Sequence, residues 1–442
     1  MRSNRYDVAV IGAGIVGLAV AREVLARRPG ARVLVVDRHA AVAQQQTGHN
    51  SGVIHAGVYY APGSLKARLC VQGARMMQEF CDENAVRYER CGKLIVAVDE
   101  SELARLADLE ARGHANGVPG LRRVEAAEIA DIEPECRGVA ALHSPGTGIV
   151  DFAAVAGAIE RDLRDRGVTF ALGCEITAIR RRPGGSAAMP TGEPGQTAGR
   201  SGRAATELVH AGGSFLADWV IVCAGLWSDR LAVSAGAPAD PRVVPFRGAY
   251  LRLADDQPPV VRGLVYPVPD PALPFLGVHV TRHIDGGVLL GPTALLVASR
   301  DVSRRPRGRP APRRGESPDG PLAHASGTLH DLLDTLTWPG TWAVARTFWR
   351  TGLSELAMAS SRKLFVRECA KYVPAVAAMR IDAGTTRGVR AQAVGRDGRL
   401  VDDFAISQTP GATHVRNAPS PAATSSFALA REIVDRYEAA AG

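Results

Sequence analysis

Three glycines near the N-terminus, Gly12, Gly14 and Gly17, have the spacing G-x-G-x-x-G between an apolar, strand-like run and a stretch with helical apolar spacing. In such a unit Gly12 permits a tight turn, Gly14 lets the backbone approach a pyrophosphate, and Gly17 allows the helix to pack closely on the strand. Asp37 ends a second apolar run about 20 residues later, where a carboxylate accepts hydrogen bonds from ribose hydroxyls. These residues predict a dinucleotide-binding unit, and they fit FAD and NAD equally well.

The segment that follows, from Gln46 to Tyr60, is rich in small and hydroxyl-bearing residues. An NAD-binding domain usually continues here into another regular strand–helix unit, whereas a flavin enzyme needs irregular backbone to line the isoalloxazine ring. The segment also contains His49 and His55, and an isolated histidine of this kind is more often a hydrogen-bonded loop residue than a catalytic one. The segment therefore favours FAD over NAD.

A series of ordered motifs extends this pattern along nearly the whole chain. They occupy residues 47–60, 62–67, 245–248, 267–279, 388–392 and 417–425. Through these motifs the chain resembles the bacterial L-2-hydroxyglutarate oxidases (dehydrogenases), members of the FAD-dependent, D-amino-acid-oxidase-like family. One segment rich in arginine and proline, 299–321, departs from the family pattern.

The resemblance implies that a hydride passes from C2 of a 2-hydroxy acid to flavin N5, while a base takes the hydroxyl proton and cations hold the carboxylates. Arg390, in the apolar setting Gly-Val-Arg-Ala, is expected to bind one carboxylate bidentately. Arg247 is expected to bind a second carboxylate, so that the pair holds a dicarboxylate. The alternative for each arginine is a surface position.

Two histidines are candidates for the base, because the unperturbed pKa of histidine is about 6.5. His55 is placed slightly ahead, since it lies in the better-matched loop. His279 lies on a predicted strand, with Val278 and Val280 on either side. Each could instead be a structural histidine. Tyr266 is expected to bond a substrate carboxylate, or else to be a core aromatic residue.

The resemblance also assigns residues to FAD. They are Thr47, Asn50, Ser51, Gly52, Ile176, Ala224, Gly225, Gly388, Ser420, Ala422 and Thr424, in addition to the glycine unit and Asp37. Ile176 lies where backbone groups contact adenine. The segment 420–424 is expected to open the final helix, whose positive dipole end would face the flavin pyrimidine, where negative charge grows on reduction.

The composition of the chain limits which partners and which cellular location are expected. The chain has 442 residues, 46% of them hydrophobic, and no apolar run approaches the roughly 20 residues that span a bilayer. Its seven cysteines show no C-x-x-C spacing, which favours reduced thiols over disulfides or a metal site. Without a signal-like segment at its start, the protein is expected to be cytoplasmic.

The net charge of +8 raises the question of a nucleic-acid partner. Only four of the 53 basic residues are lysines, so the charge reflects an arginine bias of the whole chain, and no nucleic-acid partner is expected. A cluster of arginines between Arg304 and Arg314 is compatible with peripheral contact to the inner face of the cell membrane.

The order of predicted elements indicates an α/β fold, in which a Rossmann-like FAD-binding domain is interleaved with a substrate-binding domain built on a mixed or antiparallel sheet. The expected FAD-binding domain comprises residues 1–90, 145–235 and 380–442. The expected substrate-binding domain comprises residues 91–144 and 236–379, with a flexible insertion at 299–321.

Several alternatives remain open at this level. A quinone, oxygen or an electron-transfer protein can each serve as electron acceptor. One alternative function is that of a related flavin oxidoreductase of the same fold, acting on another small 2-hydroxy acid, on glycerol 3-phosphate or on an amino acid. A flavin-dependent tRNA-modifying protein and a non-enzymatic dinucleotide sensor are the rivals from other classes.

Overall fold

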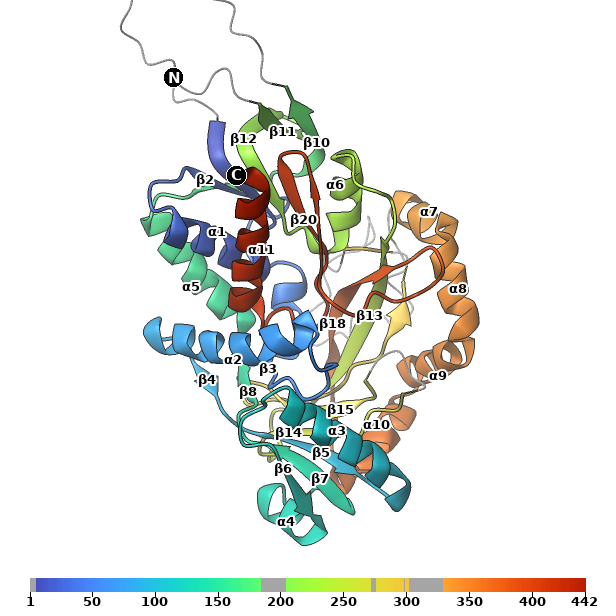
Figure 1. Ribbon diagram of the computed structural model, residues 1–442. Helices are drawn as coiled ribbons and strands as arrows, with labels where there is room; N and C mark the ends of the chain where they lie inside the picture. The colour runs from blue at the N-terminus through green and yellow to red at the C-terminus, as the bar shows by residue number, and fades with distance from the viewer. Residues whose placement is uncertain (1–4, 184–203, 272–275, 298, 302–328) are drawn as a thin grey trace, which may run out of the picture.

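The computed structural model describes residues 5–183, 204–271, 276–297, 299–301 and 329–442 (Figure 1). Nearly all of the surface loop expected at 183–203 lies outside the described residues. The same is true of the insertion expected at 299–321 beyond its first three residues, including the arginine cluster.

An eight-stranded sheet carries the dinucleotide-binding unit. Its parallel strands are β1 (Arg5–Ile11), β2 (Val33–Asp37), β9 (Thr169–Leu172), β12 (Gly213–Val222) and β20 (Ala412–Asn417). Antiparallel strands β10 (Ile176–Arg182), β11 (Ala205–His210) and β19 (Ala405–Thr409) extend it.

Both faces of this sheet are buried, because alternate residues of its strands enter two different cores. Val8 and Val10 of β1 pack with helices α1 (Ile15–Arg27), α5 (Phe152–Asp165) and α11 (Ser426–Ala441). Ala9 and Ile11 pack on the other side, where α6 (Ser228–Ser234) contributes Leu231. The continuous apolar runs that predicted buried strands therefore reflect burial from two sides.

A nine-stranded sheet forms the second layer, in the order β17-β13-β16-β15-β14-β5-β7-β6, with β18 beside β13. Its strands are β5 (Lys93–Ala97), β6 (Arg122–Glu125), β7 (Ala140–Ser144), β13 (Arg242–Leu253), β14 (Leu264–Pro267), β15 (His279–Arg282), β16 (Val288–Gly291), β17 (Leu295–Leu296) and β18 (Ile381–Val394). All neighbours are antiparallel except β14 and β5. The expected fold class, a Rossmann-like layer with a mixed-sheet layer, is confirmed.

Smaller elements complete the fold. They are a three-stranded sheet of β3 (Val53–Ile54), β8 (Gly148–Val150) and β4 (Tyr88–Glu89), together with helices α2 (Leu65–Glu83), α3 (Leu103–Ala115), α4 (Ala126–Ile132), α7 (Leu329–Thr337), α8 (Pro339–Thr347), α9 (Trp349–Ser360) and α10 (Arg362–Ala370).

The division into two domains stays a prediction. Strand β18, which that division places with the FAD-binding unit, pairs with β13 of the second sheet.

The final helix differs from the prediction. It begins at Ser426, and residues 420–425 form turns ahead of it. Pro419 and Pro421 explain the later start, because proline disfavours helical backbone in the residue before it. The predicted opening of the helix at Ser420 was therefore wrong.

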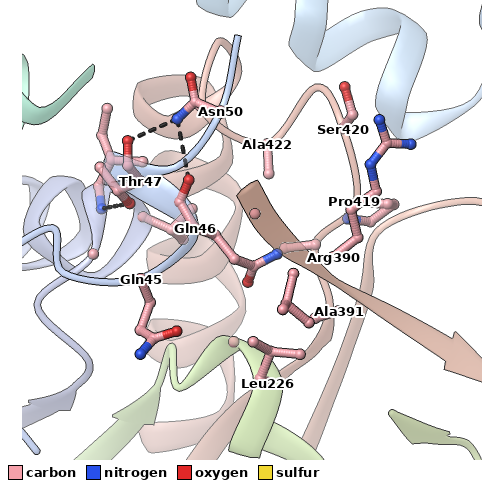
Figure 2. A pocket seen from close by; sticks show the side chains of 18 of the residues that line it. Gln45, Gln46, Thr47, Asn50, Leu226, Arg390, Ala391, Pro419, Ser420 and Ala422 are labelled. Atoms are coloured by element: carbon pink, nitrogen blue, oxygen red, sulfur yellow. Dashed lines mark hydrogen bonds between the residues drawn. The ribbon is translucent and has the colours of Figure 1, made fainter. Parts of the chain in front are cut away.

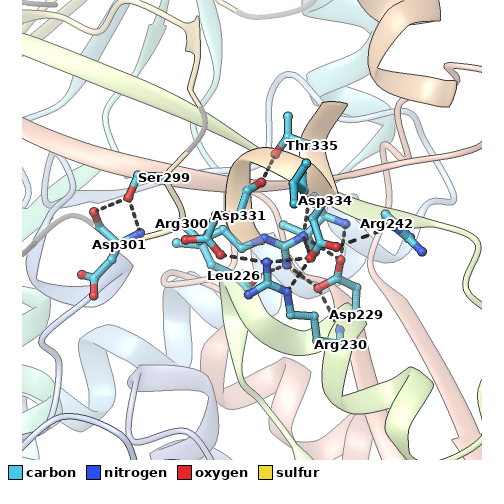
Figure 3. A network of polar contacts seen from close by, with 12 residues as sticks. Leu226, Asp229, Arg230, Arg242, Ser299, Arg300, Asp301, Asp331, Asp334 and Thr335 are labelled. Atoms are coloured by element: carbon cyan, nitrogen blue, oxygen red, sulfur yellow. Dashed lines mark hydrogen bonds and ion pairs between the residues drawn. The ribbon is translucent and has the colours of Figure 1, made fainter. Parts of the chain in front are cut away.

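A buried ion pair joins the two large sheets. Arg300 is 1% exposed, and its guanidinium donates to both carboxylate oxygens of Asp229 on α6, at 2.5 and 3.0 Å. It also donates to the carbonyl oxygens of Leu226 and Val243, the latter on β13 (Figure 3). Arg300 thus satisfies acceptors from both halves of the molecule at once.

We predict that Arg300→Met destabilises the protein by about 3–5 kcal/mol, because it leaves the Asp229 carboxylate buried without its partner. Urea denaturation of the FAD-saturated protein measures the loss. The double variant Arg300→Met/Asp229→Leu should recover stability, since no buried charge remains.

Arg75→Met is the matched control, because Arg75 pairs with Glu79 on an exposed helix surface and should contribute at most about 1 kcal/mol. An Arg300→Met variant no less stable than this control would contradict a structural role for the buried pair.

Candidate active site

A cavity of about 860 Å³ lies where the carboxyl ends of β1, β2 and β12 face β18. The structure brings most of the predicted site residues to its wall: Gly12, Gly14, Gly17, Asp37, Thr47, Asn50, Ser51, His55, Ile176, Ala224, Gly225, Tyr266, His279, Gly388, Arg390, Ser420, Ala422 and Thr424. Gly52 and Arg247 are not among the lining residues. Residues far apart in the sequence therefore form one elongated site.

The glycine turn leaves no room for side chains. Gly12 has a φ of +112°, and a Cβ atom there would lie 2.3 Å from the carbonyl oxygen of Cys223. A Cβ atom on Gly17 would lie 2.0 Å from the carbonyl oxygen of Gly12, so helix α1 packs directly on the turn. Gly14 is the N-cap of α1 and provides no side-chain cap, which leaves the positive end of the helix facing the cavity. This end of the site fits a pyrophosphate.

Asp37 also stabilises the turn. One of its carboxylate oxygens accepts a hydrogen bond from the Ala13 N–H at 2.7 Å, and the other accepts from the His39 N–H at 2.8 Å. The carboxylate lines the cavity and retains lone pairs for a ribose hydroxyl. Asp37 thus orders the phosphate-binding turn and presents the acceptor that the sequence predicted.

The loop after β2 is fixed by its own side chains. Asn50 donates to the carbonyl oxygens of Gln46 and Thr47 at 3.1 and 2.7 Å, and its side-chain oxygen accepts from the Gly52 N–H (Figure 2). Thr47 accepts a hydrogen bond from the Ile15 N–H at the start of α1. These side chains order the backbone that lines the cavity. Gly52 contributes its N–H to this network, although it is not itself a lining residue.

Strand β18 closes the opposite side of the cavity. A Cβ atom on Gly388 would lie 2.3 Å from the carbonyl oxygen of His49, so the strand packs against the loop at this glycine. Figure 2 shows Arg390 and Ala391 of β18 close to Pro419 and Ser420. The second sheet therefore delivers a guanidinium to the dinucleotide-binding half.

Arg390 and Arg247, the two side chains predicted to bind the substrate carboxylates, lie on different sides of the second sheet. In the β13–β18 ladder Arg390 lies opposite Phe246, and Arg247 lies opposite Val389. Neighbouring residues of a strand project from opposite faces, so the side chains of Arg390 and Arg247 leave the sheet on different sides. Arg390 lines the cavity, whereas Arg247, which is 8% exposed, does not.

His279 is held in one tautomer. Its Nδ1 lies 2.9 Å from the carbonyl oxygen of Gly277, and because a carbonyl only accepts, Nδ1 carries the proton. Burial, followed by the charges of Lys93 and Arg390, lowers the pKa of His279 to about 3. The ring is therefore neutral, with its lone pair on Nε2. It stacks on Tyr266 with ring centroids 3.9 Å apart.

His55 lies close to the same group of charges. Burial, then Lys93, His279 and Arg390, lower its pKa well below the usual value. Its backbone N–H donates to Thr424 at 3.1 Å, whereas its buried Nδ1 has no hydrogen-bond partner. His55 is thus placed in the site, but its tautomer is not fixed as that of His279 is.

Lys93, which the sequence analysis did not name, lies next to the site against the rings of Tyr59 and Tyr266, although it is not itself among the lining residues. It begins β5, is 3% exposed, and lies 4.3 Å from the centroid of the Tyr266 ring. Burial lowers the pKa of its ammonium to about 8. Within the described residues no carboxylate lies within ion-pair distance of it. A lysine inside the apolar run Gly-Lys-Leu-Ile-Val-Ala, in a chain with four lysines, was the available signal.

The comparisons identify the class of protein. A family model described as FAD dependent oxidoreductase (DAO) matches residues 7–436, and the chain belongs to this family. Among solved structures, the fold is similar to L-alpha-glycerophosphate oxidase from Mycoplasma pneumoniae with FAD bound, with a TM-score of 0.70 and 22% identity over 97% of this chain and 94% of that one. FAD is the cofactor, and the glycine turn, the N-terminal end of α1 and Asp37 fit it.

Closer relatives share one name. The chain is 42% identical to a mitochondrial L-2-hydroxyglutarate dehydrogenase of Nematostella vectensis, over 98% of this chain and 91% of the relative. Its identity to the human mitochondrial enzyme of that name is 38%, over 99% and 89%. Its identity to the L-2-hydroxyglutarate dehydrogenase of the bacterium Indibacter alkaliphilus is 37%, over 96% of each chain.

We predict that Gly12→Ala abolishes FAD binding, because the added methyl group meets the Cys223 carbonyl and the backbone conformation at Gly12 disfavours a side chain. The measure is the flavin released per chain on denaturation. Gly30→Ala is the control, since nothing lies within 4 Å of a Cβ atom there. Full FAD content in Gly12→Ala would contradict this assignment of the phosphate-binding turn.

Proposed function

We propose that this protein oxidises L-2-hydroxyglutarate to 2-oxoglutarate and passes the electrons to a quinone, oxygen or an electron-transfer protein. The near full-length similarity to enzymes of that name carries the proposal. The cavity supports it, because Arg390 lines the cavity and Lys93 lies against the lining residue Tyr266, so that two cations are available for a dicarboxylate. Peripheral contact with the membrane through residues 304–314 stays a separate prediction.

Steady-state turnover with an artificial electron acceptor tests the substrate. L-2-hydroxyglutarate should be oxidised, and D-2-hydroxyglutarate should be much slower because its C2–H points away when both carboxylates are held. L-lactate lacks the second carboxylate and should be poorer by about tenfold to a hundredfold in kcat/KM. Equal turnover of L-lactate and L-2-hydroxyglutarate would rule out a site built for a dicarboxylate.

The side chains of the cavity have distinct roles in this proposal. Bound FAD would supply the hydride acceptor, its N5 atom, for the hydrogen at C2 of the substrate. Arg390 holds the carboxylate beside C2, because a guanidinium can donate two parallel hydrogen bonds to it. Burial raises the pKa of Tyr266, so its hydroxyl stays protonated and can donate to the same carboxylate. Together these contacts orient C2 for the reaction.

Lys93 takes the role first expected of Arg247. Its buried ammonium lies 4.3 Å from the centroid of the Tyr266 ring, which stacks on His279. A second carboxylate of the substrate would supply the counter-charge that this ammonium lacks within the described residues. We therefore assign to Lys93 the recognition of the distal carboxylate.

His279 is the proposed base for the hydroxyl proton, ahead of His55. Its Nδ1–H is tied to a carbonyl oxygen, which leaves Nε2 as the acceptor. Burial lowers the pKa of His279 most, and in the site without substrate the charges of Lys93 and Arg390 lower that pKa further. A bound dianion offsets these charges and raises that pKa toward the range useful for proton transfer.

We predict that His279→Ala lowers kcat by roughly 10²–10⁴, because the proton then has no positioned acceptor. His55→Ala should lower it less. Both variants must keep their FAD for the rates to be compared. A normal kcat in His279→Ala with a large loss in His55→Ala would reverse the assignment, and normal rates in both would place the base on another residue.

We predict that Lys93→Met lowers kcat/KM for L-2-hydroxyglutarate by about tenfold to a hundredfold and leaves kcat/KM for L-lactate nearly unchanged. The two substrates serve as each other's control, since a merely structural defect would affect both.

The pH profile gives an independent measurement. The ammonium is the binding form, so kcat/KM of the wild-type protein should fall as the pH rises through about 8, where Lys93 loses its proton. Lys93→Arg should remove this fall, because arginine stays charged. An unchanged profile in Lys93→Arg would contradict the role.

A further inference from the structure

A second surface of the molecule is apolar, and none of its apolar side chains lines the cavity. Most of the large apolar side chains that are exposed in the described part of the chain come from helices α7, α8 and α9. They are Leu329, Leu332, Leu333, Leu336, Trp342, Trp349, Leu353 and Leu356, here called the apolar patch. Figure 1 shows the three helices following one another along one edge of the molecule. Trp342 and Trp349 are 60% and 55% exposed.

Helix α7 is turned with its polar side inward. Asp331 and Thr335 are buried, and Arg230 of α6 forms ion pairs with Asp331 at 2.8 Å and with Asp334 at 2.6 Å (Figure 3). The leucines of α7 have the spacing i, i+3, i+4, i+7 and are all exposed. An ordinary surface helix buries its apolar stripe and exposes its polar one. The reversal indicates that something else covers the leucines.

The exposed charged residues that the stretch from α7 to the middle of α10 contributes are all basic. The exposed basic residues between positions 329 and 367 are Arg346, Arg350, Arg362, Lys363 and Arg367. The acidic residues of this stretch, Asp331, Asp334 and Glu355, are not exposed. The first two pair with Arg230, and Glu355 accepts a hydrogen bond from the Ala294 N–H at 2.6 Å. The patch is therefore apolar with a positive border.

We propose that the apolar patch docks on the surface of an anionic lipid bilayer. Leucine and tryptophan side chains flanked by arginine and lysine are the composition of helices that lie in the lipid interface, with the apolar side in the acyl region and the cations at the headgroups. No helix among the described residues is long and apolar enough to cross a membrane. The helices thus lie along the bilayer and do not span it.

The charges at the border of the patch favour an anionic lipid bilayer over a second copy of the chain as its partner. Two copies meeting through the patch would bring their arginine borders together, and like charges at an interface oppose association. Anionic headgroups complement the same border. This surface consists of described residues of α7 to α10 and does not include residues 304–314.

Vesicle co-sedimentation of the full-length, FAD-loaded protein tests the proposal. One set of vesicles contains phosphatidylcholine with phosphatidylglycerol, and the other contains phosphatidylcholine alone. The wild-type protein should bind the anionic vesicles more tightly. Salt should weaken the binding without abolishing it, because salt screens the charges and leaves the apolar contact intact.

The triple variant Trp342→Ser/Trp349→Ser/Leu353→Ser should bind at least about tenfold more weakly, since it removes apolar area from the contact. Val233→Ser is the matched control, because Val233 is 44% exposed on α6, outside the patch. Turnover with a soluble artificial acceptor should be the same in all three proteins. This readout separates loss of docking from misfolding and from failure of the proposed function.

Three results would overturn the proposal. They are an absence of wild-type binding to anionic vesicles, equal binding by the triple variant, and a dimer that the triple variant loses without any binding to vesicles. The last result would assign the patch to a second copy of the chain.

Discussion

Strands β13 and β18 pair along most of their length, and in an antiparallel ladder each residue's partner fixes the face from which its side chain projects. This register places Gly388 against the loop at His49 and turns Arg390 toward the cavity. A shift of one residue would exchange Arg390 for Val389 and leave the dinucleotide site without its guanidinium. The dinucleotide-binding half supplies a turn, a carboxylate and a helix end, but the groups that act on substrate come mainly from the second sheet. The function therefore depends on the order that this ladder gives to the nine-stranded sheet, and on the contacts that hold α6 against β13, among them the Arg300–Asp229 pair.

The electrostatics of the substrate end follow from burial. Lys93 and Arg390 stand close enough to His55 and His279 to lower the pKa of both rings, and burial acts in the same direction. The result is a pair of neutral imidazoles beside fixed positive charges. A hydroxy acid with two carboxylates complements this arrangement, because it brings two negative charges and a hydroxyl proton that needs an acceptor. A substrate with one carboxylate would leave part of the positive charge uncompensated, which is the physical basis of the proposed selectivity.

The sequence predicted features that depend on short stretches of chain. The glycine turn, its flanking strand and helix, and the loop from Gln46 onward required only local spacing, and ordered family motifs placed Arg390, His279 and Tyr266 in one site. Features that depend on tertiary contacts were not predicted. The face from which Arg247 projects is set by its partner on β18, some 140 residues away along the chain. The role of Lys93 depends on the rings packed around it. The reversal of α7 requires Arg230 of another helix, and no pattern within α7 indicates it.

The buried ammonium of Lys93 has a further consequence, which concerns the lifetime of the protein. Lys93 is 3% exposed and, among the described residues, no carboxylate pairs with it, so its charge raises the free energy of the folded state when the cavity holds no substrate. A dicarboxylate that binds only the folded chain lowers that free energy, by about 2.7 kcal/mol at a concentration of a hundred times its Kd. The fraction of chains that are unfolded at any moment, and hence open to proteolysis, should then decrease as the metabolite accumulates. The substrate would thus regulate how much enzyme persists in the cell as well as how fast each molecule works.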